Sequence, residues 1–315
     1  MIPVARALLA RLLVFVATVA GAAAAALVLL SLAPGDPIAL LPNAEEVRPV
    51  LEAEWALDRP LPVRVARWLG RAATGDLGIS VAYRPGMPVG HLLAGPALVT
   101  VGWWLAALGL AVAWGTGLGA WTAGKQGVTR QILRWASLVP VFVLAHLVVR
   151  GLNEGAWALM EGGHIARPAW FALPDQASDL RSVLAILVLA VGSGTLAEVH
   201  AEVEDVVASI RASGYVDAAR ARGMPVLPHI LRNLVAPVAT IAARRAAALL
   251  GGVVVVEKLL LLNGAGSILW SAAELRDYDV VVGITVGAAA LVGGARLVAD
   301  AVRIGWDPRL RAEVA

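Results

Sequence analysis

Long runs of uncharged residues alternate with polar segments along this chain. A helix needs about 20 mainly apolar residues to cross the hydrocarbon core of a bilayer. Six runs are candidates for such helices, the fourth of them short and the fifth long. They cover residues 12–33, 97–123, 133–149, 183–197, 234–262 and 280–304. The pattern therefore predicts an all-α polytopic membrane protein with about six transmembrane helices.

The first run has two interpretations. Arg6 and Arg11 precede an apolar core with small residues, as in a cleaved signal peptide. The run is long for a signal peptide and further runs follow, which favours an uncleaved first helix. Residues 34–96 mix charges, proline and glycine, and predict an external segment with an amphipathic helix at 52–71. We therefore divide the chain into residues 1–33, 34–96 and a core domain at 97–315.

Arginine and lysine are concentrated in the segments before the first run, after the second and fourth runs, and after the last. Short cytoplasmic loops carry an excess of these residues, so both termini are predicted to be cytoplasmic. The residues concerned are Arg6, Arg11, Lys125, Arg130, Arg134, Arg211, Arg220, Arg222, Arg232, Arg303, Arg309 and Arg311.

Composition agrees with a membrane protein and narrows the chemistry. Of the 315 residues, 59% are hydrophobic and 16% charged, and the mean hydropathy is +0.76. The absence of cysteine excludes a disulfide framework and a thiolate metal site. The five histidines have no metal-ligand spacing, and no basic tract interleaved with aromatic residues indicates nucleic acid binding. Five tryptophans near the predicted membrane boundaries are interpreted as interface anchors, namely Trp55, Trp68, Trp103, Trp104 and Trp270.

Two glycine-rich segments resemble nucleotide-binding motifs only by spacing. Gly119–Lys125 (GAWTAGK) matches a P-loop, but it ends an apolar helix and is followed by Gln126 where a hydroxyl would bind magnesium. Gly192–Ala197 (GSGTLA) loosely matches a dinucleotide-binding motif, but it too lies in an apolar helix and does not follow a buried strand. Glycines in membrane helices usually allow close helix contact, and we assign this role to Gly115–Gly119 and Gly283–Gly287.

The polar segment between the fourth and fifth runs is the most informative. It contains Tyr215–Gly223 (YVDAARARG), a helix-compatible stretch that ends in glycine and is followed by Pro225 and Pro228. Such a segment predicts a short protruding helix on the cytoplasmic side. A solvated connection and an amphipathic helix on the membrane surface are the alternatives.

This segment and its neighbours resemble the permease subunits of the dipeptide, oligopeptide and nickel ABC importers. The resemblance covers nearly the whole chain, and its motifs follow one another in the expected order. They are Leu32–Pro37 (LAPGDP), Ala56–Ser80 with PLP and GDLGIS, Tyr215–Gly223, His229–Thr240, Leu249–Glu257, Asn263–Gly266, Asp277–Gly283 and Asp307–Arg311.

The resemblance implies a type I ABC importer permease fold that forms half of a translocation pore. It implies a second homologous permease, two ABC ATPase subunits and an extracytoplasmic substrate-binding protein as partners, in a lipid membrane. It also implies a cytoplasmic coupling loop at about 200–233, and no cofactor on this chain, because ATP and magnesium belong to the ATPases. The docking residues carried over are Tyr215, Asp217, Ala218, Ala219, Arg220 and Gly223. The two alanines would allow close approach, and Gly223 would allow the turn.

Three positions in the fifth run are candidates for lining the pore. Arg244 and Arg245 depart from the resemblance, and an ionisable residue at membrane depth usually faces a cavity or a partner charge. They could attract an anionic group, pair with an acid, or reach the cytoplasmic edge. Glu257 is the third candidate.

The stretch from Gly223 to His229 is shorter than the resemblance leads us to expect, by about one helical turn. Together with the two arginines of the fifth run, this shortening leaves open a non-transporting subunit of an ABC complex. An ATP-independent secondary transporter or channel is the other alternative. Peptides and nickel complexes are both candidate substrates.

Overall fold

The computed structural model describes residues 2–32, 38, 44–56, 58–125, 127–164 and 179–306, and these residues are almost all helical. The elements in chain order are α1 (Ile2–Leu32), α2 (Ala44–Glu54), α3 (Leu61–Ala73), β1 (Ile79–Ser80), β2 (Met87–Pro88), α4 (Val89–Thr122), α5 (Val128–Ala136), α6 (Val141–Glu161), α7 (Asp179–Gly192), α8 (Thr195–Arg211), α9 (Gly214–Ala221), α10 (Leu227–Leu259), α11 (Ala265–Glu274) and α12 (Tyr278–Trp306). The predicted all-α class is confirmed.

Four of the described helices are long and apolar enough to cross a membrane, α1, α4, α10 and α12. Two further spans are possible if each of two bent helix pairs counts as one, α5 with α6 and α7 with α8. The described residues therefore hold between four and six spans, which agrees with the prediction of about six.

The third predicted run was wrong as a single straight helix. Residues 133–149 contain an 83° bend between α5 and α6. Pro140 caps the start of α6 and has no N–H to continue the preceding helix. A second bend of 51° separates α7 from α8, where Gly194 adopts a φ of +72°. Both breaks lie inside apolar sequence, so hydropathy alone does not reveal them.

Contacts divide the chain into two compact units. One holds residues 1–7, 101–262 and 295–315, and the other holds residues 8–100 and 263–294. The domain limits drawn from the sequence stay a prediction. Most of the motif at Leu32–Pro37 and all of the motif at Asp307–Arg311 lie outside the described residues.

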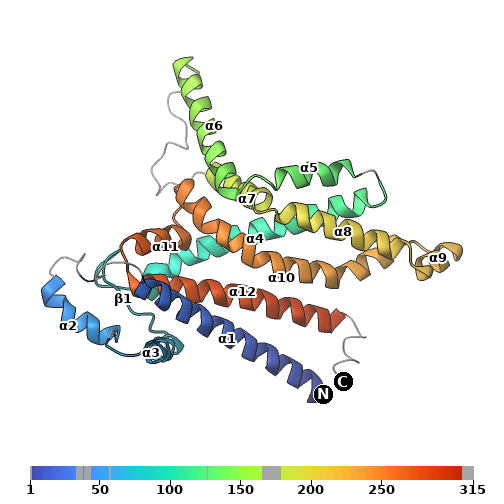
Figure 1. Ribbon diagram of the computed structural model, residues 1–315. Helices are drawn as coiled ribbons and strands as arrows, with labels where there is room; N and C mark the ends of the chain where they lie inside the picture. Colours follow the sequence, from blue (N-terminus) through green and yellow to red (C-terminus); the bar gives the residue numbers. More distant parts are fainter. Residues whose placement is uncertain are drawn as a thin grey trace. The chain divides into compact units, whose positions relative to one another are not determined.

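In the first unit α8 is the central helix, packed against α5, α7 and α10, and α10 also contacts α6 and α7. Figure 1 shows α8 and α10 side by side, with the short α9 beyond their ends. The core between them is built from β-branched and aliphatic side chains, including Val199, Val203, Val207, Ile230 and Leu234. This packing fixes the two helices that lead into and out of α9.

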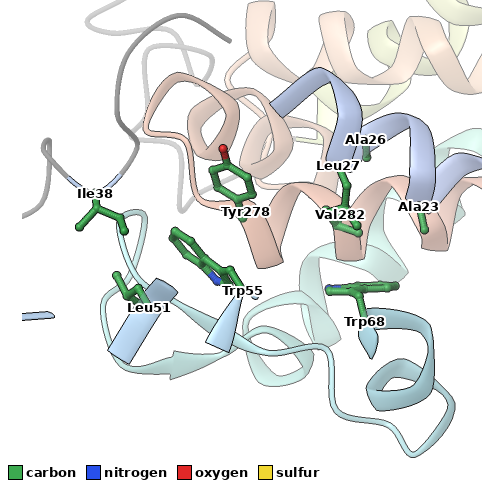
Figure 2. Packing of buried hydrophobic residues seen from close by; sticks show 9 residues of the cluster. All are labelled: Ala23, Ala26, Leu27, Ile38, Leu51, Trp55, Trp68, Tyr278 and Val282. Carbon is green, nitrogen blue, oxygen red and sulfur yellow. The ribbon is translucent and has the colours of Figure 1, made fainter. Parts of the chain in front are cut away.

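The second unit is organised around a buried aromatic cluster. Trp55 stacks on Tyr278 with 4.8 Å between ring centroids, and Figure 2 shows both rings among Leu51, Leu27 and other apolar side chains. The Tyr278 hydroxyl donates to the carbonyl of Leu30 at 3.0 Å.

The interpretation of three tryptophans as interface anchors was wrong. Trp55 and Trp68 are 8% and 7% exposed and belong to the core of this second unit. Trp104, in the first unit, is 4% exposed and donates its Nε1–H to the carbonyl of Ala246. Packing against sequence-distant helices buries all three rings.

The external segment also differs from its prediction. The single helix expected at 52–71 is two helices, α2 and α3, because Pro60 caps the start of α3 and a second proline lies in its first turn. After α3, the carboxylate of Asp76 accepts two hydrogen bonds from Arg71, and this pairing lowers the pKa of Asp76. The backbone N–H of Gly78 adds a further bond to Asp76.

The turn between β1 and β2 is held by one buried carboxylate. Asp277, at 0% exposure just before α12, accepts a hydrogen bond of 2.6 Å from the Ser80 hydroxyl. The same Oδ2 atom accepts the backbone N–H groups of three successive residues, Val81, Ala82 and Tyr83, at 3.0–3.1 Å. Two of the motifs quoted above, at 75–80 and 277–283, therefore bind each other.

Candidate functional site

The candidate site is the segment between α8 and α10, residues 212–226, which we call the coupling segment. It contains the eight-residue helix α9, preceded by Ser213 in an extended conformation. Figure 1 shows α9 beyond the ends of both long helices. Of the interpretations left open by the sequence, the structure agrees with a short protruding helix.

Gly223 ends α9 in a left-handed turn with a φ of +68°. The N–H of Met224 bonds to the carbonyl of Ala219, and the N–H of Gly223 bonds to the carbonyl of Arg220. These two bonds define a Schellman motif, in which glycine is favoured because a Cβ would be strained. The predicted role of Gly223 in the turn is confirmed, and its role in docking stays a prediction.

The predicted docking residues fall on different faces of the coupling segment. Tyr215 is 45% exposed, Ala218 is exposed, and the side chains of Asp217 and Arg220 are 66% and 53% exposed. Asp217 and Arg220 form an ion pair of 3.1 Å along the exposed face. Ala219 is 3% exposed and faces inward. Close approach by a partner would therefore depend on Ala218, and Ala219 serves packing within the chain.

Two residues of α10 support the coupling segment and were not singled out from the sequence. The Asn233 side chain donates to the Tyr215 hydroxyl at 3.0 Å. The His229 ring meets the Tyr215 ring edge-on, with centroids 6.4 Å apart. Both lie within the quoted motif at 229–240, but nothing in their spacing indicates that they orient Tyr215.

Arg211, the last residue of α8, binds the end of α4. Its Nη1 donates to the carbonyl of Ala123 at 2.6 Å and its Nη2 to the carbonyl of Ala120 at 3.3 Å. The last carbonyls of a helix lack intrahelical partners and carry partial negative charge, so a guanidinium there is stabilising. Arg211 thereby fixes the point at which α8 enters the coupling segment.

Ion pairs connect α8 to the helices on either side of it. Arg130 of α5 binds both carboxylate oxygens of Asp205 at 2.8 and 3.0 Å. On the other side, Arg244 of α10 pairs with Glu202. Arg245 donates to Glu198 at 2.8 Å and to the carbonyl of Ser193 at 2.7 Å. The contacts of the two α10 arginines agree with the pairing alternative, and a role in lining the pore stays a prediction.

Close contact between α4 and α8 depends on glycine. A Cβ on Gly115 would lie 2.7 Å from Val199, and one on Gly119 would lie 2.7 Å from the carbonyl oxygen of His200. The predicted role of Gly115–Gly119 in close packing is confirmed. In the second pair, a Cβ on Gly283 would lie 3.2 Å from the Val89 side chain, whereas one on Gly287 would meet nothing within 4 Å.

The remaining candidate residues are accounted for as follows. Glu257 is 1% exposed in α10. Gly119 of the P-loop-like segment lies inside α4, and Lys125 rests over the Trp121 ring at 3.8 Å, while Gln126 is outside the described residues. The described part of the chain contains no group of three His, Asp or Glu side chains arranged to hold a metal.

The helices define a multi-pass membrane protein with an exposed coupling segment, which follows a helix, α8, that ion pairs join to its neighbours. Comparison with known proteins identifies the family more closely. The model of the binding-protein-dependent transport system inner membrane component matches residues 115–312. The chain therefore belongs to this family of inner-membrane transport components.

Curated relatives cover most of the chain. A peptide permease protein of Brucella ovis is 31% identical over 311 residues, covering 90% of this chain and 92% of the relative. The oligopeptide transport system permease protein OppB of Mycobacterium tuberculosis is 28% identical and covers 81% of this chain and 82% of its own length. The corresponding AppB of Bacillus subtilis is 27% identical, with 90% and 92% covered.

Proposed function

We propose that this protein is the permease subunit of an ATP-driven, binding-protein-dependent importer. It forms half of a translocation pore for peptides or a related small solute. The observation that carries the proposal is the coupling segment, an exposed helix supported at both ends within a chain of this family. The names of the relatives support peptides as the substrate class. Nothing in the chain favours an ATP-independent transporter.

The coupling segment would act by docking. The exposed face with Tyr215, Ala218 and Arg220 enters a cleft on an ATPase subunit, where ATP and magnesium are bound. When the ATPases close, the movement reaches α8 through Arg211 and reaches α10 through Asn233 and Tyr215. This chain performs no covalent chemistry in the cycle.

The complete importer would contain a second homologous permease, two ATPases and an extracytoplasmic binding protein. The basic residues near the coupling segment and after the last apolar run support an orientation in which both termini and α9 are cytoplasmic. The external segment with α2, α3 and the β-hairpin then faces the binding protein.

The test is affinity purification in mild detergent, followed by ATP-driven uptake in proteoliposomes. Replacing Ala218 by Trp places a bulky group on the exposed face of α9, and Ala208→Trp is the control at an exposed alanine of α8. We expect Ala218→Trp to lose the ATPase chains and uptake while keeping the second permease. The control should keep all partners.

Three results would contradict the proposal. Unchanged co-purification and uptake in Ala218→Trp would refute docking through this face. Transport by the purified chain alone, without ATP, would refute the importer assignment and favour a secondary transporter. Recovery of ATPases with no transport by the wild-type complex would favour a non-transporting subunit.

A further inference from the structure

A pocket between α10 and α12, within the first unit, is lined by an unusual number of charges. Its volume is about 340 Å³, and its lining includes Arg244 from α10 and Arg296, Asp300 and Arg303 from α12. Ala243 and Ala299, which are 9% and 7% exposed, face the same space. The small side chains at these two positions leave the space between the helices unfilled, and the volume of the pocket is within the size range of small-ligand sites.

The charges of this pocket do not balance within the described residues. Arg244 is paired with Glu202, and Arg303 lies 3.8 Å from Asp300. Arg296 forms no hydrogen bond or ion pair with any described residue and is exposed. Three guanidinium groups therefore face two carboxylates, which leaves one positive charge. An uncompensated charge in a membrane helix usually faces a water-filled path or an anionic partner.

The depth of Arg296 distinguishes between possible anions. Trp306, at the end of α12, is 48% exposed and donates to the carbonyl of Arg232 at 2.8 Å. Tryptophan in such positions marks the membrane interface. Arg303 is one turn from Trp306, within reach of a lipid phosphate. Arg296 is ten residues away, or roughly 15 Å, and its Cα–Cβ bond tilts toward the start of α12, away from this interface.

We propose that the pocket binds a free carboxylate of the translocated solute, with Arg296 as the residue that anchors it. A guanidinium binds a carboxylate through two parallel N–H···O bonds, and no lipid headgroup reaches this depth without leaving the interface. The inference rests on the proposed function as a permease. It also assigns to Arg296 the anion-binding role considered for Arg244 and Arg245. Arg244 is paired with Glu202, and the Arg245 guanidinium binds Glu198 and the carbonyl of Ser193.

The test compares two solutes that differ in one group. The complete importer is reconstituted with its binding protein, and ATP-driven uptake is measured for trialanine and for its C-terminal amide. The binding protein is the same throughout, so its own preference cancels when variants are compared. Arg296→Gln should lower the acid-to-amide uptake ratio roughly tenfold or more, the effect of losing a charged hydrogen bond. Arg296→Lys should retain part of the preference.

Arg134→Gln is the matched control, because it removes an exposed arginine of α5 outside the pocket. Its ratio should equal that of the wild type. An unchanged ratio in Arg296→Gln would overturn the inference. An equal fall for both peptides, with loss of the second permease on purification, would assign Arg296 to an acid of that partner instead.

Vesicle composition separates the lipid alternative. Uptake is measured in phosphatidylethanolamine vesicles with and without phosphatidylglycerol, and a ratio that changes only with phosphatidylglycerol would assign the pocket to a lipid. If the wild-type chain recovers no ATPase on purification and shows no ATP-driven uptake of either peptide, the proposed function fails and the inference with it. If every variant transports both peptides at an unchanged acid-to-amide ratio, carboxylate binding by Arg296 is refuted and the proposed function as a permease stands.

Discussion

Two neighbouring ion pairs between α8 and α10 should differ in strength, and the difference can be measured. The Arg245 side chain is 13% exposed and binds Glu198 and the carbonyl of Ser193. The pair of Arg244 and Glu202 is more open, with side chains 54% and 37% exposed. Exposed ion pairs contribute about 0–1 kcal/mol, whereas breaking a buried pair costs about 3–5 kcal/mol.

The Arg245 pair lies between these limits, because Glu198 is half exposed. We expect Arg245→Met to lower the free energy of unfolding by about 2 kcal/mol, and Arg244→Met to lower it by less than about 1 kcal/mol. A double-mutant cycle with Glu198→Gln should give a coupling energy of about 1–2 kcal/mol.

The assay is reversible unfolding of the purified chain in dodecylmaltoside micelles with increasing dodecyl sulfate, followed by far-ultraviolet circular dichroism. The cycle of Arg244→Met with Glu202→Gln is the matched control, because both arginines bind acids on the same helix. Equal effects at the two arginines, or no coupling between Arg245 and Glu198, would refute the argument from burial.

Three further predictions concern other contacts and use the same assay. Gly119→Ala should destabilise the chain by about 1–3 kcal/mol, because the new methyl group would overlap the carbonyl of His200, and a neutral result would show that α4 moves away freely. Asp277→Asn should cost about 1.5–3 kcal/mol by replacing a charged acceptor in the hairpin turn, and an unchanged stability would contradict its role there. Because pairing with Arg71 lowers the pKa of Asp76, the stabilisation is full above the unfolded pKa and lost as pH falls through the folded one. The stability difference between wild type and Asp76→Asn should therefore shrink below about pH 4, and a constant difference would contradict it.

Hydropathy predicted the elements whose apolar runs are long and uninterrupted. The runs at 97–123, 234–262 and 280–304 correspond to α4, α10 and α12, with ends displaced by up to eight residues. It did not predict the breaks at Pro140 and Gly194, because both positions lie within the apolar runs at 133–149 and 183–197. A left-handed glycine or a capping proline bends the path of the chain without changing its hydrophobicity.

The site was predictable in position but not in its contacts. The motif at 215–223 placed α9 and its terminal glycine correctly. The partners of Arg245 are about 50 residues away in sequence, and those of Arg211 about 90. No periodicity within one helix reveals which acid or carbonyl a distant arginine meets. The inward orientation of Ala219, next to the exposed Ala218, likewise depends on packing against neighbouring helices.

The bend at Gly194 makes the position of α9 depend on the direction in which α8 leaves it. Its 17 residues form a rigid helix of about 25 Å that begins at the left-handed Gly194 and leads at its other end to α9. Arg245 binds the carbonyl of Ser193, next to the bend, and Arg211 joins the other end of α8 to α4. If α8 rotates about Gly194 together with the helices packed on it, the displacement grows along its length and is largest at α9. The close contacts of Gly115 and Gly119 with α8 would then move the end of α4 as well. A substitution that makes the bend at Gly194 more rigid would reduce the displacement of α9 while leaving every docking side chain in place.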